Sequence, residues 1–180
     1  MPRLLTYQEL NLLDRDGKIT EIIHKVFYNH PAPATRHQDY SRNIEGILLK
    51  YLEKHPVGIL YDAPTDVILS EEDVVQPDLL FIKMENKHII KEHGIVGVPD
   101  LMIEVISDES YDIKKKMPLY ATYSVKHLWY VFPDEKLIKI YRLKGVKYDL
   151  TNAVSEKDSF THSLFPGLMI KAKSVFRKNF

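Results

Sequence analysis

"GVPDLMIEVIS", residues 97–107, has the composition of a buried β-strand, yet it carries Asp100 and Glu104. Side chains alternate across a strand, so these two carboxylates share one face and alternate apolar residues share the other. An isolated buried carboxylate is so costly that it normally takes up a proton or finds a cation. Asp100 follows Pro99 at the start of the strand, where water or a backbone group can satisfy it. We interpret Asp100 first as structural, with a role near a metal as the alternative, whereas the deeper Glu104 needs a partner.

A second stretch, "QPDLLFI" (76–82), repeats the pattern, with Asp78 after Pro77 at the head of an apolar strand. If the two strands are neighbours, Asp78 and Glu104 converge at one point. Converging carboxylates suit a hard divalent cation, Mg²⁺ first and Mn²⁺ as the alternative. Such a metal polarises a phosphoryl oxygen and lowers the pKa of a bound water. The pair therefore predicts a metal site for phosphodiester hydrolysis, although an aspartate after proline also commonly caps a turn.

Phosphodiester hydrolysis also needs a cation that holds the attacking water or the developing negative charge. Lys114, Lys115 and Lys116 follow the strand and supply three candidates, against the alternative of a solvated, cationic helix start. Asp112 and Lys114 spell D-x-K, but they lie in a polar, lysine-rich turn after the strand. We regard that triplet as the weaker interpretation.

The composition limits the function classes. With 180 residues and 44% apolar content, the chain predicts one core and one domain over 1–180. Lys+Arg and Asp+Glu are equal at 25 each, which weakens a nucleic-acid interpretation without excluding a local basic groove. The absence of cysteine excludes disulfides, thiolate zinc sites and cysteine nucleophiles. The N-terminus reaches charge too early for a signal peptide, and no apolar run approaches the roughly 20 residues of a spanning helix. We expect a soluble, cytoplasmic protein without a membrane segment.

Apolar periodicity and turn residues predict the remaining elements. In the first part of the chain we expect a helix over 6–14 capped by Thr6, a strand over 19–28, and a helix over about 36–54 with a capping box from Thr35 and Gln38. In the middle we expect antiparallel strands around the turn at 70–73, a connector with a short helix over 83–96, a strand over 100–106 and a helical segment within 107–124. Towards the C-terminus we expect a hairpin around "PDEK" (133–136), a strand or ordered arm over 159–170 and a short basic helix.

Several motifs, in their order along the chain, resemble the Uma-type family, a bacterial group of proposed restriction endonucleases within the PD-(D/E)xK nuclease superfamily. They are "VVQPDLLFI", "GVPDLMIEVIS", "DIKKKMPLYATYSVKHLWYVFP" and "LIKIYRL", together with "LTYQEL", "PAPATRHQ" and "LFPGL". Each motif alone is weak, but their order and spacing cover nearly the whole chain. The resemblance implies an α/β fold with a restriction-endonuclease-like core, in which helices flank a mixed β-sheet with β-hairpin additions. It also implies Mg²⁺-dependent hydrolysis of DNA.

By this resemblance Asp78 matches the first metal-binding aspartate and Glu104 matches the acidic residue of the second half-motif. The superfamily's lysine normally follows that acid by two residues, where this chain has Ile106. In the Uma-type group the lysine lies on the following helix instead. The implied catalytic set is Asp78, Glu104 and Lys116, with Asp78 and Glu104 as the metal ligands.

The group's D…K…Y pattern on that helix matches Asp112, Lys116 and Tyr120. A helix brings Lys116, Tyr120 and Tyr123 to one face, so Lys116 can reach back towards Glu104. The tyrosines themselves have two interpretations, as core residues or as stacking surfaces for bases. The same choice applies to Tyr130 and Tyr141.

Two further positions remain open. The group's "DGE" element after the early strand has no match, because His24, Lys25 and Val26 stand there, so the contribution of that acid has no assigned source. His37 faces inward at the first turn of the long predicted helix. It is either an ordinary half-buried histidine or a residue that orients a metal-bound water or a carboxylate.

The main alternative is a catalytically inactive relative that binds a protein or nucleic-acid partner, which the neutral charge and the missing "DGE" acid favour. A nuclease should bring Asp78 and Glu104 close enough to share one ion, with Lys116 nearby. Separated or ion-paired carboxylates would favour the inactive alternative. A homodimer built on an exposed hairpin edge is compatible with either.

Overall fold

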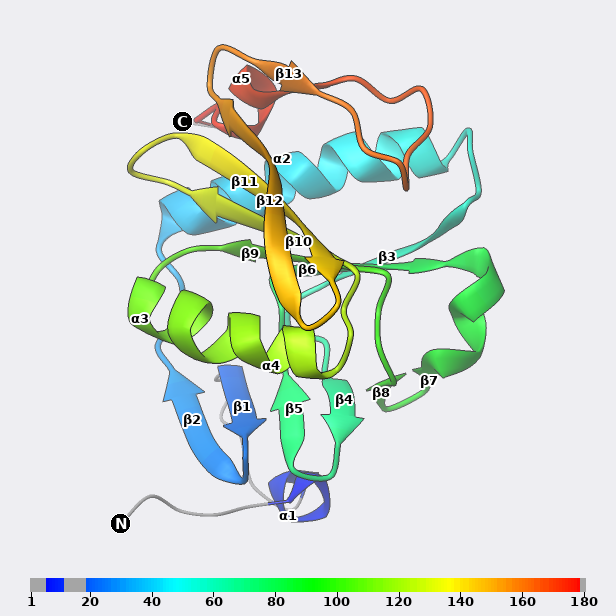
Figure 1. The fold of residues 1–180 in the computed structure, drawn as a ribbon, viewed down its shortest axis with the longest axis vertical. Coiled ribbons are helices and arrows are strands. Elements are labelled where there is room, and N and C mark those ends of the chain that lie inside the picture. The colour runs from blue at the N-terminus through cyan, green and yellow to red at the C-terminus, as the bar shows by residue number, and fades with distance from the viewer. Residues whose placement is uncertain (1–5, 12–18, 179–180) are drawn as a thin grey trace.

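A computed structural model describes residues 6–11 and 19–178 of the chain, and its strands form two large sheets (Figure 1). The first sheet has the order β2 (Val26–His30), β1 (Ile19–Ile23), β5 (Asp73–Val75), β4 (Val67–Ser70), β8 (Gly94–Val96), β7 (Ile90–Lys91). The second has the order β12 (Lys147–Ser155), β11 (Leu137–Lys144), β10 (His127–Phe132), β9 (Leu101–Val105), β6 (Leu79–Lys83), β3 (Gly58–Asp62). A small third sheet pairs β13 (Ser159–Phe160) with β14 (Ile170–Lys171).

Helices lie on both sides of the second sheet, with α2 on one side and the α3 to α4 segment on the other (Figure 1). The helical elements are α1 (Tyr7–Asn11), α2 (Thr35–Leu52), the 3₁₀-helix η1 (Met84–Ile89), α3 (Glu109–Tyr111), the π-helix η2 (Asp112–Lys116), α4 (Met117–Thr122) and α5 (Ala172–Val175). Both large sheets are mixed, because β9 runs parallel to β10 and β4 runs parallel to β8. The predicted α/β class with mixed strands and flanking helices is confirmed.

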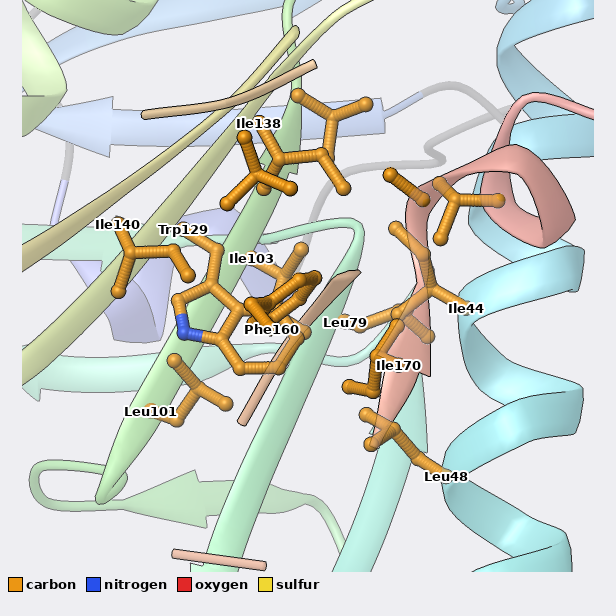
Figure 2. Packing of buried hydrophobic residues seen from close by; sticks show 14 of the residues in the cluster. Ile44, Leu48, Leu79, Leu101, Ile103, Trp129, Ile138, Ile140, Phe160 and Ile170 are labelled. Atoms are coloured by element: carbon orange, nitrogen blue, oxygen red, sulfur yellow. The ribbon is translucent and has the colours of Figure 1, made fainter. Parts of the chain in front are cut away.

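The alternation read in "GVPDLMIEVIS" divides the core as predicted. Leu101, Ile103 and Val105 pack with residues of α2 and with Trp129 in one cluster, part of which Figure 2 shows. Met102 packs on the other face with Leu119, Tyr120 and further residues from the α4 side. Because apolar layers cover both faces of β9, Glu104 is enclosed in the interior rather than left on a solvated surface.

The predicted strand over 19–28 is wrong in one respect, because the chain folds there into the hairpin β1–β2. His24 and Lys25 form its two-residue turn, with φ angles of 52° and 65°. Positive φ at both central positions is the type I′ geometry that Asn-Gly or Asp-Gly normally signals. His-Lys carries no such signal. The hairpin places β1 inside the first sheet, between β2 and β5.

The two caps predicted for helices differ in outcome. Thr6 and Glu9 form a reciprocal cap, since Glu9 Oε2 accepts from the Thr6 N–H at 2.7 Å and Thr6 Oγ1 accepts from the Glu9 N–H at 3.4 Å. The capping box assigned to Thr35 and Gln38 is absent, because α2 begins one residue earlier than expected. Ala34 is the N-cap residue, without a side-chain cap, and its carbonyl accepts from the Gln38 N–H at 3.1 Å.

The two apolar stretches before residue 83 are antiparallel as predicted, but each divides between the two sheets. β4 pairs with β5 in the first sheet, while β3 pairs with β6 in the second. Pro64 and Pro77 lie in the breaks, which fits the inability of proline to donate to a strand ladder. Asp78 therefore lies where the chain crosses from the first sheet to the second.

The C-terminal part follows the prediction in outline. The hairpin around "PDEK" joins β10 to β11, and α5 is the short terminal helix. Strand β12 was not predicted, and the expected strand over 159–170 is limited to β13 and β14 at its two ends. Within residues 6–11 and 19–178, no helix has the length and apolar character needed to cross a membrane.

Candidate active site

A cleft of about 340 Å³ lies where the two sheets meet. Its wall comprises the loop of residues 31–34, the start of α2, the 76–78 crossing, the end of β9, and residues of β1, α3 and η2. Asp78, Glu104 and Lys116 all line this cleft. The structure thus brings together the three residues that the sequence singled out.

Asp78 and Glu104 converge because their strands are neighbours, as the sequence analysis required. Strand β6 pairs antiparallel with β9, with Leu79 opposite Ile103. Asp78 precedes β6 and reaches across to β9, where the Val105 N–H donates to its Oδ2 at 2.7 Å. This bond anchors Asp78 beside the backbone of the residue that follows Glu104.

Glu104 is 3% exposed, and its contacts with the described residues all use one carboxylate oxygen, Oε1. Its Oε1 lies 2.7 Å from Lys116 Nζ and accepts a hydrogen bond from the Tyr120 hydroxyl. Burial raises the pKa of Glu104 to about 8; Lys116 opposes the rise, while Asp78 and Asp112 add to it. The cleft therefore holds more carboxylate charge than Lys116 alone balances.

Lys116 is the buried member of the lysine run, at 3% exposed. Its Nζ lies between Glu104 Oε1 and Glu21 Oε1, which is 3.1 Å away. Burial disfavours its charge, but Glu104 and Glu21 outweigh that effect and raise the pKa of Lys116 well above its usual value. Lys114 is exposed, and Lys115 donates to the Tyr28 hydroxyl at 2.8 Å, so neither takes the position of Lys116.

Asp112 and Lys116 line the same cleft from the two ends of one helical turn, the π-helix η2. A π-turn widens a helix locally and is frequent at functional sites, and η2 spans the five residues from Asp112 to Lys116. The Asp112 Oδ2 accepts from the N–H groups of Ser107 and Asp108 at 3.4 and 3.5 Å. The D-x-K alternative of Asp112 with Lys114 is not assembled, because Lys114 does not line the cleft.

Glu21 is a site residue that the sequence analysis missed. It lies on β1, is 1% exposed, and reaches the cleft from the first sheet. Oε1 accepts from the Gln76 N–H at 2.7 Å as well as contacting Lys116. Oε2 accepts from the Tyr111 hydroxyl at 2.7 Å and lies 3.3 Å from His30 Nε2.

These contacts keep Glu21 ionised. Burial acts to raise the pKa of Glu21, but Lys116, the nearby His30 ring and the hydrogen bonds from Gln76 and Tyr111 together lower it to about 2. The signal for Glu21 was present in "ITEII", where a carboxylate interrupts an apolar strand as Glu104 does. The resemblance to the Uma-type group placed the acid of its "DGE" element at positions 24–26, which lie at the β1–β2 turn, whereas Glu21 lies on the strand before that turn.

His37 lies against the other carboxylate. Its Nε2 is 3.2 Å from Asp78 Oδ2, an arrangement in which the ring orients Asp78. Burial acts to lower the pKa of His37, but the hydrogen bond and charge of Asp78 outweigh it and raise that pKa. Of the two interpretations given for His37, the geometry fits the one in which it orients a carboxylate.

Asp100 lies apart from this cleft and has a structural environment. Its Oδ2 accepts from the Lys83 N–H at 2.8 Å, and the Asn86 side-chain amide donates to both of its oxygens at 3.0 Å. These bonds hold the start of β9 to the segment that follows β6. The structural interpretation of Asp100 fits this arrangement, and the metal alternative has no geometric support.

The tyrosines of the predicted stacking face are largely engaged in the interior. Tyr120 and Tyr130 are buried, and Tyr130 donates to the Asp112 carbonyl at 2.7 Å. Tyr123 donates to Asp73 Oδ2 at 2.6 Å. Tyr141 is partly buried and packs in the same hydrophobic cluster as the other three tyrosines. The core interpretation fits these four residues better than base stacking.

The donor set fits a divalent cation. Within the described part of the chain, no hydrogen bond or ion pair occupies Asp78 Oδ1 or Glu104 Oε2, and both residues line the cleft. Mg²⁺ keeps several waters and commonly uses only one or two carboxylates. No group of three or more His, Cys, Asp and Glu side chains in the described residues forms a fuller cage.

The positions of Asp78, Glu104 and Lys116 agree in part with the nuclease interpretation and in part with the inactive alternative. Asp78 and Glu104 line one cleft and Lys116 lies beside Glu104, which agrees with the nuclease interpretation as far as the shared cleft and the nearby lysine. Glu104 is nevertheless ion-paired with Lys116 and Asp78 contacts His37, as the inactive alternative requires. Each pairing uses one carboxylate oxygen, so neither pairing by itself prevents the other oxygen of that carboxylate from binding a cation.

The chain is similar to known proteins both in its sequence and in its fold. The family model described as "Uma2: Putative restriction endonuclease" matches residues 5–173. A crystal structure described as "a putative nuclease belonging to DUF820" from Anabaena variabilis matches with a TM-score of 0.78 and 17% sequence identity, over 95% of this chain and 97% of that one. At that identity the likeness supports the fold alone. No curated protein matches the chain.

Proposed function

Because the chain belongs to the Uma2 family, we propose that it is a nuclease that hydrolyses DNA phosphodiester bonds with a divalent metal. The family match confirms the resemblance drawn from the sequence motifs. The observation that carries the proposal is the buried Lys116 ammonium, held between Glu21 and Glu104 in the cleft that Asp78 also lines. A fixed cation beside uncommitted carboxylate oxygens is the arrangement that phosphodiester hydrolysis needs.

Asp78 and Glu104 would hold the metal, Mg²⁺ or Mn²⁺, through the oxygens that face the cleft. When bound, the metal would supply Lewis acidity towards a phosphoryl oxygen and lower the pKa of a coordinated water. It would also offset the two causes that raise the pKa of Glu104, burial first and then the charge of the neighbouring carboxylates. His37 and the Val105 N–H fix Asp78, while Tyr120 fixes Glu104.

Lys116 positions the attacking water or stabilises the negative charge that develops on the phosphate. Preorganised charge is effective because it needs no reorientation during the reaction. Glu21 supplies the preorganisation: its four contacts lock the carboxylate, and the carboxylate holds the ammonium in place. Glu21 is therefore a positioning residue rather than a metal ligand.

The test is nicking of supercoiled plasmid with Mg²⁺ or Mn²⁺, comparing wild type with Asp78→Asn and Glu104→Gln. Glu135→Gln is the matched control, because it removes a carboxylate from the exposed β10–β11 turn. We expect metal-dependent nicking by wild type and the control, and a loss of about 100-fold or more in the two site variants. Equal rates in all four proteins would contradict the proposal.

The second candidate is an inactive relative that binds a partner through the same fold. The Lys116 ion pairs favour it, because they partly neutralise the carboxylates without a metal. For that candidate, metal would neither bind in the cleft nor support nicking. The homodimer suggested by an exposed edge stays a prediction, with the edge strands β12 and β3 of the second sheet as its candidates.

A further inference from the structure

A second polar pocket, of about 250 Å³, lies away from the cleft at the start of β10. Its wall joins β10, β11 and β12 to the segment after β13, through residues that include His127, Arg142 and His162. His162 packs on Trp129, with ring centroids 5.2 Å apart. Trp129 belongs to the α2 face of the second sheet, whereas Tyr120, which donates to Glu104, belongs to the opposite face.

Local irregularities of the sheet build this pocket. The register between β11 and β12 shifts after Ile140, and Thr151 is the extra residue, with its hydroxyl donating to the Ile140 carbonyl at 3.0 Å. A β-bulge of this kind redirects side chains and is common at functional positions. On the other side, Arg142 pairs in register with His127, which puts the guanidinium and the imidazole on neighbouring strands.

Two groups of the pocket, on His162 and Arg142, offer hydrogen-bond donors that no described residue is seen to accept. The Leu164 N–H donates to His162 Nδ1 at 3.3 Å, so the neutral ring carries its proton on Nε2, and no described residue accepts it. Arg142 makes no salt bridge in the described part of the chain. Asp149, opposite Arg142 on β12, lies 3.8 Å from Lys144 instead.

The charge at the wall of the pocket is positive. No Asp or Glu of the described residues lines it, while Thr161, Ser163 and Asn152 add hydroxyl and amide donors. The two imidazoles have ring centroids 4.8 Å apart. Burial lowers the pKa of His162 to about 4, with His127 and Arg142 acting in the same direction, so both rings are held neutral beside the guanidinium.

We propose that this pocket is a phosphate-binding site, in which the Arg142 guanidinium and the His162 Nε2–H donate to the oxygens of one phosphate group. Arginine is the preferred partner of phosphate because its planar fork donates two parallel bonds. A transition metal is disfavoured, because the guanidinium repels a cation and no described carboxylate lines the pocket to bind it. The volume accommodates one phosphate with several waters of roughly 30 Å³ each.

The phosphate has two chemical sources, a free phosphate compound or the backbone of a nucleic acid. Neither choice rests on the chemistry proposed for the cleft, because the pocket lies on the other face of the sheet. The two sources are separated by testing inorganic phosphate and a short single-stranded oligodeoxynucleotide as alternative probes. Binding of both favours the backbone, and binding of inorganic phosphate alone favours a free compound.

The experiment follows the imidazole signals of His127 and His162 by NMR in the full chain during titration with each probe. Chloride at matched ionic strength is the baseline. Arg142→Gln removes the proposed donor, while Lys147→Gln removes one charge from the same β11–β12 hairpin without lining the pocket. Both positions are exposed, so both variants should fold.

We expect saturable shifts of both imidazole signals with phosphate and not with chloride. Arg142→Gln should raise the Kd for phosphate by about ten-fold, as expected for the loss of a charged hydrogen bond. Lys147→Gln should leave the Kd nearly unchanged. The site would be refuted by shifts no larger than those with chloride for both probes, or by equal Kd values in the two variants.

Discussion

Glu21 and Glu104 contact the same ammonium, yet their surroundings drive their pKa values in opposite directions. Four contacts satisfy Glu21 and bring its pKa to about 2. Glu104 is also buried, and its contacts with the described residues use Oε1 alone; burial raises its pKa to about 8, with Asp78 and Asp112 adding to the rise. This separation of two like groups fits the proposed roles, in which Glu21 stays charged and positions Lys116 while Glu104 binds the metal.

Replacing Lys116 by methionine should lower the stability of the protein, because both buried glutamates depend on its charge. Methionine keeps most of the side-chain volume, but it leaves the buried Glu21 and Glu104 without their shared cation. We expect the free energy of unfolding to fall by about 3 kcal/mol, which is typical of breaking a buried ion pair. Urea unfolding measures it, with Lys114→Met as the control at an exposed lysine of the same run. Equal stability of the two variants would contradict the assigned burial of Lys116.

Glu21→Gln should separate positioning from metal binding. The amide oxygen that this change introduces can still accept from the Gln76 N–H, but the neutral side chain no longer holds the Lys116 ammonium by charge. We expect nicking to slow by about 10- to 100-fold while metal affinity changes little. Single-turnover nicking at saturating Mn²⁺ and a metal titration give the two quantities. A variant that loses metal binding would show that Glu21 is instead a ligand.

His162 gives the chain a defined pH dependence of stability. Its folded-state pKa of about 4 lies below the usual value near 6.5, so the unfolded state binds more protons between these values. Stability should therefore be complete above about pH 7 and fall as the pH drops towards 4. Allowing for partial exposure, we expect wild type to lose about 1 to 2 kcal/mol more than His162→Gln between pH 7 and pH 5. The free energy of unfolding of each protein is measured by urea unfolding at several pH values. If it falls by the same amount in the two proteins between pH 7 and pH 5, the assignment to His162 is refuted.

At the scale of elements, the type I′ turn of β1–β2 is the feature that most affects the site, because it places Glu21 on an inner strand. Asp78 and Glu104 could be predicted, since a carboxylate at or within an apolar strand is visible in the sequence. The hairpin could not, because His24 and Lys25 adopt positive φ without the glycine or asparagine that normally signals it. The N–H groups of His24 and Lys25 donate to Asp73 and Glu72 at the start of β5, and such tertiary contacts leave no local sequence pattern.

Replacing His24-Lys25 by Asn-Gly should stabilise the protein. The left-handed region costs an ordinary residue about 1 kcal/mol, and Asn-Gly removes most of that cost. The bond from the His24 backbone N–H to Asp73 Oδ1, at 2.7 Å, remains available, and the changes remove two contacts of exposed side chains, His24 Nδ1 with Asp73 at 3.5 Å and Lys25 with Glu72 at 2.7 Å. We expect the free energy of unfolding to rise by about 1 kcal/mol. A decrease of that size in thermal or urea unfolding would show that the side chains matter more than the turn geometry.

At the scale of the whole molecule, the site depends on two sheets meeting at one cleft, with α2 closing the core of the second. Glu21 comes from the first sheet, Glu104 from the second, and Asp78 from the crossing between them. The class of fold and most strands could be predicted, because the alternation of apolar residues in strands and their helical periodicity are local features of the sequence. The division of 58–83 between two sheets is a property of the assembled molecule, so only the breaks at Pro64 and Pro77 hinted at it.

The contribution of α2 can be measured with two neighbouring leucines. Leu48 is 0% exposed and packs in the core of Figure 2, while Leu49 is 42% exposed on the same helix. We expect Leu48→Ala to lower the free energy of unfolding by about 2 to 5 kcal/mol through lost burial and a cavity. Leu49→Ala should change it by less than about 1 kcal/mol. Similar losses in the two variants would contradict the packing of α2 on the sheet.

The most direct test of the central claim, that Asp78 and Glu104 share one divalent cation beside Lys116, is a Mn²⁺ titration followed by electron paramagnetic resonance. Wild type would be compared with Asp78→Asn, Glu104→Gln and the exposed control Glu135→Gln. We predict one bound Mn²⁺ per chain in wild type and the control, and binding weakened by about ten-fold or more in each site variant. Equal Mn²⁺ binding in all four proteins, or none in wild type, would contradict the shared site.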